Sequence, residues 1–131
     1  MRLYILLLLG CLGIYSPLAA QSFDRFFSDK TMRFDYFRCG NHENETIYFD
    51  KIKEEPFWGG SKNNLTDTFE YGKHRFLIYD LATGTLIYSR GYCSLFNEWQ
   101  ATEEAHTTSK CYPESVVFPY PQKPVRIVLE S

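Results

Sequence analysis

A β-hairpin predicted over residues 71–90, with the sequence YGKHRFLIYDLATGTLIYSR, constrains the fold of this chain more than any other stretch. Apolar side chains occupy both faces of its arms, since Phe76 and Ile78 alternate with other apolar residues and the second arm repeats the pattern. A hairpin with one face in water would be polar at every second position, so this pair is expected inside a two-layer structure. Between the arms, Asp80 can accept hydrogen bonds from turn amides, and Gly84 can adopt the positive φ of a type I turn followed by a bulge.

Four further segments of the chain are predicted to form strands. Alternating or β-rich runs lie at residues 31–38, 46–52, 115–118 and 125–129. The aromatic content of 18% also suits pleated strands better than helices. A length of 131 residues limits the chain to one domain, placed at residues 21–131. We therefore predict an all-β fold, a two-layer antiparallel β-sandwich of jelly-roll type with long ordered loops.

The remaining segments are predicted to be short helices and loops. Residues 22–29 carry three phenylalanines at helical spacing and are expected as a short helix or an ordered arm packed on the sandwich. Residues 91–100 are predicted to be irregular, and residues 102–105 to make one helical turn. Three prolines in residues 119–124 predict a crossing loop that takes no part in a strand ladder.

The first 20 residues have the pattern of a cleaved signal peptide. Arg2 supplies a positive start, an apolar run follows to Tyr15, and small residues at 16–20 suit a signal peptidase. This apolar run is shorter than the ~20 residues that span a bilayer. The chain is therefore expected to be exported to the periplasm, the cell surface or the medium. A lipoprotein anchored through Cys11 is the less favoured alternative.

Three cysteines, Cys39, Cys93 and Cys111, remain after the predicted cleavage. An odd number allows at most one disulfide within the chain and leaves a free or intermolecular thiol. In the alternative interpretation, at least two of the three are small buried side chains with no redox role.

Charge and motif content exclude several classes of function. A net charge of −2 and a pI near 5.9 provide no basic footprint for nucleic acid. The G-x-S-x-G turn of serine hydrolases is absent. Residues 59–62, GGSK, lack the spacing of a phosphate-binding loop.

Several sequence pieces, taken in order, resemble one family. They are residues 55–62 (EPFWGGSK), 88–92 (YSRGY), 98–105 (EWQATEEA), 117–119 (VFP) and 123–126 (KPVR). These pieces resemble the N-terminal domain of the IgA peptidase family, secreted bacterial zinc metallopeptidases typical of Bacteroidetes. The resemblance covers nearly all of the chain after residue 20, and it implies a β-sandwich accessory domain that precedes a separate catalytic domain.

The zinc site of such a peptidase is not expected in this chain. A zinc peptidase carries H-E-x-x-H on a helix, because two imidazoles one turn apart bind the metal and the carboxylate activates its water. His42 is followed by a glutamate but by no histidine at the fourth position, and His74 and His106 stand apart from it. The three histidines are predicted to be ordinary surface or edge residues, with no catalytic residue, metal or other cofactor in the chain.

Two functions follow from these observations. The first is a non-catalytic accessory domain of an exported peptidase, which braces the peptidase domain or positions a protein substrate. The alternative is a free-standing secreted module that binds carbohydrate or protein through exposed aromatic rings. For that surface the candidate residues are Phe57, Trp58 and Trp99.

Overall fold

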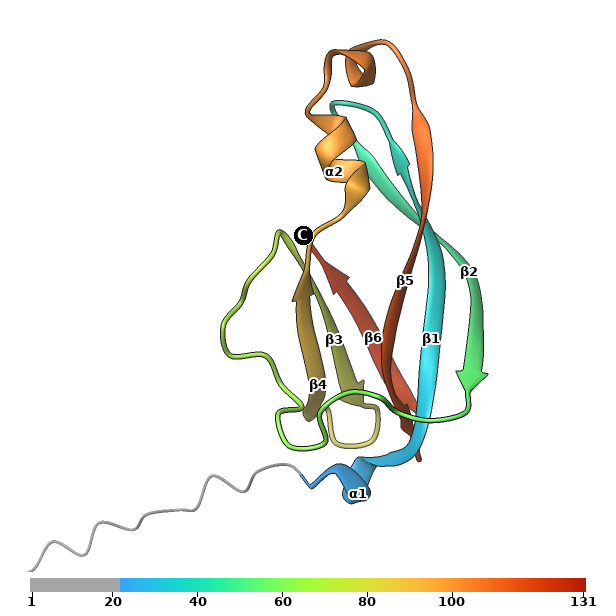
Figure 1. The fold of residues 1–131 in the computed structure, drawn as a ribbon, viewed down its shortest axis with the longest axis vertical. Coiled ribbons are helices and arrows are strands. Elements are labelled where there is room, and N and C mark those ends of the chain that lie inside the picture. Colours follow the sequence, from blue (N-terminus) through green and yellow to red (C-terminus); the bar gives the residue numbers. More distant parts are fainter. Residues whose placement is uncertain (1–21) are drawn as a thin grey trace, which may run out of the picture.

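A computed structural model describes residues 22–131 of the chain (Figure 1). The predicted signal peptide and Cys11 lie outside these residues. Within them, no helix is long and apolar enough to cross a membrane.

The fold consists of two three-stranded sheets packed as two layers (Figure 1). Its elements are α1 (Phe23–Phe26), β1 (Phe27–Gly40), β2 (Glu45–Glu55), β3 (His74–Asp80), β4 (Leu86–Tyr92), α2 (Leu95–Gln100), the 3-10 helix η1 (Glu103–His106), β5 (Lys110–Pro121) and β6 (Val125–Glu130). The strand order is β2-β1-β5 in the first sheet, here called sheet A, and β4-β3-β6 in the second, sheet B; every neighbouring pair is antiparallel. The predicted all-β sandwich is confirmed.

The hairpin of residues 71–90 is present as β3 and β4, and its turn has the predicted chemistry. The Asp80 carboxylate accepts hydrogen bonds from the backbone N–H of Thr83 at 2.9 Å and from its hydroxyl at 2.7 Å. Gly84 has a φ of 69° and donates its N–H to the Asp80 carbonyl at 2.8 Å. These contacts hold the Asp80 carboxylate in its charged form, so the pKa of Asp80 is lower than usual.

The core lies between the sheets and is largely aromatic. Inward side chains of both layers meet there, with Phe76 of β3 and Phe118 of β5 at a ring-centroid distance of 6.5 Å. Phe23 and Phe27 are buried against this core and Phe26 packs on it, as predicted for the segment at residues 22–29. A second, smaller cluster of Phe96, Trp99 and Ala105 with Tyr112 lies where α2 and η1 extend beyond sheet B (Figure 1).

Two of the predicted irregular segments are regular. Pro119 and Pro121 lie inside β5, opposite Thr31 and Phe27 of β1, so the prediction of a loop without ladder pairing was wrong for these two positions. Because β5 is an edge strand, a proline can lie in it without removing a hydrogen bond from an inner ladder. Residues 95–100, predicted to be irregular, form α2, which Ser94 caps by accepting a hydrogen bond from the Phe96 N–H at 3.1 Å.

The outer edge of β4 is covered by the loop that connects β2 to β3. The N–H of Ser89 donates to the Leu65 carbonyl at 3.0 Å, and the N–H of Gly91 donates to the Asp67 carboxylate at 3.1 Å. A covered edge cannot pair with another chain. The loop passes so close that a Cβ on Gly91 would lie 1.8 Å from the Tyr71 carbonyl oxygen.

Replacement of Gly91 by alanine is therefore expected to destabilise the protein, because the backbone of the loop has to move. We expect a loss of about 1–3 kcal/mol, typical of overpacking, in urea denaturation. Gly59→Ala is the control, since a Cβ there meets no atom within 4 Å. Equal stability of the two variants would contradict the close approach of this loop.

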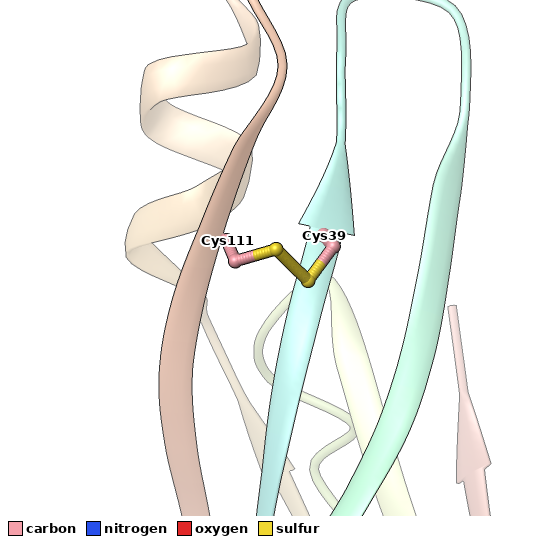
Figure 2. The surroundings of a disulfide bond; sticks show 2 residues. All are labelled: Cys39 and Cys111. Carbon is pink, nitrogen blue, oxygen red and sulfur yellow. A yellow bond between two sulfur atoms is a disulfide. The ribbon is translucent and has the colours of Figure 1, made fainter.

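A disulfide joins Cys39 of β1 to Cys111 of β5, which lie opposite each other in the ladder (Figure 2). Cys93 is free and exposed, and Cys39 and Cys111 are joined in the disulfide and not fully buried, so the interpretation of at least two cysteines as buried apolar residues was wrong. The disulfide closes a loop over a sequence separation of 72 residues, for which chain entropy predicts about 4 kcal/mol of stabilisation.

Candidate functional site

A buried charged cluster lies at the end of the core near α2. Arg38, whose side chain is 1% exposed, points inward from β1 on the same face as Tyr36. Its Nε donates to Glu114 Oε2 at 3.0 Å, its Nη1 donates to Glu45, and its Nη2 donates to the Tyr92 hydroxyl at 3.0 Å. The hydroxyls of Tyr36 and Tyr92 lie 2.9 Å apart. Three strands of sheet A and one of sheet B therefore meet at one guanidinium.

Every charged side chain and every hydroxyl of this cluster has a hydrogen-bond partner within it. Burial raises the pKa of Tyr36, and interactions with Tyr92 and Glu114 raise it further, so the phenol stays neutral. Burial also disfavours the Glu114 carboxylate, but its interactions with Ser94, Tyr36 and Arg38 outweigh burial and lower its pKa. The polar groups of the cluster all have hydrogen-bond partners, and a buried network of this kind favours a single, well-ordered packing of the core.

A cavity of about 200 Å³ lies beside the cluster. Tyr92, Cys93, Tyr112 and Glu114 are among its lining residues. The thiol is exposed, and the Glu114 carboxylate already accepts from Arg38 and Ser94. The cavity thus presents no unpaired buried polar group to a ligand.

The three aromatic residues predicted as a binding surface do not share one surface. Trp99 is 7% exposed within the smaller core cluster, and its Nε1 donates to Glu104 at 2.8 Å. Trp58 packs edge-on to Tyr88 and is partly buried. Phe57 is 77% exposed. Phe57 and Trp58 follow the end of β2 and Trp99 lies on α2, at opposite ends of the molecule (Figure 1).

The outer face of sheet A carries an apolar row that crosses all three strands. Phe37 of β1 lies opposite Tyr48 of β2 and Pro113 of β5, and residues paired in this way share a face. The exposed fractions are 38% for Phe37 and 56% for Tyr48, and Pro113 is also exposed. The Cys39–Cys111 disulfide lies directly beside the row. We call Tyr48, Phe37 and Pro113 the sheet A row.

Residues 22–131 match the sequence family described as Peptidase M64 N-terminus. The chain belongs to this family. The match spans every residue that the structure describes, and it confirms the resemblance found in the sequence. A search of curated proteins gave no match.

An M64 N-terminal domain is not itself the catalytic part of the peptidase. Within residues 22–131, no group of three His, Cys, Asp or Glu side chains is placed to hold a metal ion.

The histidines of this M64 N-terminal domain differ in their surroundings. His42 and His106 are exposed and lie with ring centroids 3.7 Å apart, although 64 residues of sequence separate them. His74 is fully buried, so its prediction as a surface or edge residue was wrong. The sequence held a signal for this burial, because His74 has the same alternation as Phe76 and Ile78 on the inner face of the hairpin.

Proposed function

We propose that this M64 N-terminal domain is a non-catalytic accessory domain that braces a metallopeptidase domain and so holds it in position for a protein substrate. The observation that carries the proposal is the family match over residues 22–131. A domain that stands at the N-terminus of a peptidase and lacks catalytic residues acts through what it contacts. Its contribution is therefore a binding surface.

The surface that best fits this role is the sheet A row. The outer face of an antiparallel sheet that meets water is usually polar. Here Phe37 and Tyr48 are large, exposed and adjacent, and exposed Val117 lies further along the same face, opposite Arg33. Contiguous exposed apolar side chains on a soluble domain mark interaction surfaces. Charged pairs beside the row, such as Asp35 with Arg33, supply the polar rim that such interfaces have.

Binding to a separately purified metallopeptidase domain of an M64 family member tests this proposal. We expect association measurable by calorimetry, and a loss of at least about 30-fold in affinity for the Phe37→Ser, Tyr48→Ser double variant, as for a hot spot of about 2 kcal/mol. Leu81→Ser is the control, because Leu81 is also a large exposed apolar residue but lies in the β3–β4 turn. Absence of association, or equal affinity of the double variant, would rule out the sheet A row as the contact.

The proposal also predicts that this chain alone has no peptidase activity. Incubation with immunoglobulin A and a zinc salt is expected to leave the antibody intact in gel electrophoresis. A cut that a chelator abolishes would overturn the assignment as an accessory domain. Export is part of the same proposal, supported by the signal peptide pattern of residues 1–20.

Exposed rings elsewhere favour a second candidate, a secreted binding module for carbohydrate or protein. Phe69 and Tyr71 stack with an interplanar angle of 12° and a centroid distance of 5.6 Å, both strongly exposed, and Phe57 is exposed as well. A flat ring can pack on the apolar face of a sugar. The buried Trp99 cannot provide such a ring, but the exposed Phe57 and Tyr71 can. A glycan array should therefore be probed with the parent protein and with the Phe57→Ser and Tyr71→Ser variants. No signal on the array for the parent protein would remove the carbohydrate-binding version of this candidate.

A further inference from the structure

Three of the four edge strands in the two sheets are protected against pairing with another chain. In sheet B, the loop between β2 and β3 covers the edge of β4. In sheet A, β5 contains Pro113, Pro119 and Pro121, which have no N–H to donate to a neighbouring strand. The other edge of sheet A, β2, has a register shift at Asp50 and a charged sequence at residues 50–54, DKIKE. Covered edges, prolines, bulges and charges all prevent pairing between sheet edges.

The edge of β6 lacks this protection. The strand Val125–Glu130 contains no proline and pairs with β3 without a register shift, and among the described residues it pairs with no other strand. Every second residue therefore directs its backbone N–H and C=O groups away from β3. Apolar side chains lie on both faces, with Ile127 and Leu129 toward the core and Val128 on the outer face. Such an edge is a template for a further strand.

The charges of β6 match those of a second β6 that runs antiparallel to it. In a twofold ladder centred on Val128, Arg126 lies opposite Glu130 of the second copy, and the same pair recurs at the other end. On the core face, Ile127 lies opposite Leu129 of the second copy. Opposite charges and apolar side chains placed directly across a strand pair stabilise the pair. The sequence of β6 is thus complementary to itself.

Other twofold registers lose this match. A ladder centred one residue earlier places Arg126 opposite Val128, and one centred one residue later places Glu130 opposite Val128, so that a charge faces an apolar side chain. Ladders centred on Arg126 or on Glu130 place like charges opposite each other, which is destabilising. Only the ladder centred on Val128 pairs both charges of each strand.

Neighbours on β3 hold both charged side chains in place on the outer face. The guanidinium of Arg126 lies over the ring of Tyr79, the residue opposite it in the ladder, at 4.7 Å from the ring centroid. Glu130 pairs with Arg75, the residue opposite it, at 2.9 Å. Side chains that are ordered in the free protein lose less entropy when they form an interface.

We propose that the edge of β6 is a homodimerisation surface, at which β6 pairs antiparallel with β6 of a second copy of this chain about a twofold axis at Val128. Sheet B of the two copies then forms one continuous sheet with the strand order β4-β3-β6-β6-β3-β4. The interface uses the same patch of both copies, as a closed twofold dimer requires. It belongs to sheet B, so it leaves the sheet A row free for a peptidase domain.

Sedimentation equilibrium over a range of protein concentrations tests this proposal. Cys93→Ser is present in every sample, because the exposed Cys93 thiol can otherwise join two copies through a disulfide. A single pair of strands is a small interface, so we expect a monomer–dimer equilibrium with a dissociation constant of about 10–100 µM. A protein that stays monomeric up to about 1 mM would overturn the proposal.

Charge reversals test the register of the dimer. Arg126→Glu places carboxylates opposite each other at both ends of the ladder, and Glu130→Arg places guanidinium groups there. Each variant alone is therefore expected to dimerise at least about tenfold more weakly than the parent. In an equimolar mixture of the two variants, a heterodimer again has opposite charges at both ends. We expect its dissociation constant to lie within about threefold of the parent value, which also shows that both variants are folded.

Lys53→Glu is the control, because Lys53 is an exposed charge on another edge strand, β2, and dimerisation should not change. The Phe37→Ser, Tyr48→Ser double variant should also dimerise like the parent, so the test does not depend on the binding of a peptidase domain. Undiminished dimerisation of the two charge-reversed variants, or no heterodimer in their mixture, would contradict pairing through β6.

Discussion

Removal of residues 125–131 is expected to leave a protein that aggregates or does not fold. β6 pairs with β3 from Arg75 to Asp80, and the side chains of Val125, Ile127 and Leu129 pack against the main core. Each such side chain contributes up to ~1.5–3 kcal/mol, against a total stability of ~5–15 kcal/mol for a domain. The deletion also turns β3 into an open edge that can pair with another chain. Size-exclusion chromatography and thermal melting measure both effects.

Two point variants show whether the effect comes from packing in β6. Ile127→Asn places an amide on the inner face and should lower the melting temperature by several degrees. Arg126→Asn changes the exposed neighbour on the other face and should have little effect. If the shortened chain remained soluble and melted cooperatively near the temperature of the parent, β6 would be dispensable to the domain.

Replacement of Arg38 by methionine is expected to cost about 3–5 kcal/mol of unfolding free energy. The substitution keeps most of the side-chain volume but removes the guanidinium with which Glu114 and Glu45 both pair. A buried carboxylate without a partner must either unfold the site or take up a proton. Urea denaturation at neutral pH measures the loss. We expect part of the stability to return at acidic pH, because protonation removes the unpaired charges.

Arg75 provides a matched control for this prediction. It also pairs with two glutamates, Glu70 at 2.6 Å and Glu130 at 2.9 Å, but its side chain is 38% exposed compared with 1% for Arg38. Surface ion pairs contribute ~0–1 kcal/mol, so Arg75→Met should be close to neutral. Equal losses for the two variants would show that burial does not set the strength of the Arg38 cluster.

Contacts between neighbours in the chain made the hairpin predictable. The alternation of apolar residues and the turn chemistry at Asp80 and Gly84 both act within a few residues, and β3 and β4 formed where they indicated. The one-turn helix at residues 102–105 was indicated in the same way and is present as η1. Helix α2, which follows Ser94, was not predicted, because it has only six residues and its burial depends on Tyr112 of β5.

Contacts between residues far apart in sequence could not be predicted from such local patterns. Alternation along β1 places Arg38 on the inner face with Tyr36, but its partner Glu114 is 76 residues away and the pairing depends on the register of β1 with β5. The same register places Cys39 opposite Cys111, whereas the sequence showed only that at most one disulfide could form within the chain. The sheet A row likewise arises from strands far apart in sequence. Local periodicity specifies which face of a strand a side chain takes; which groups meet across that face is set by strand order and register, because these fix the long-range distances.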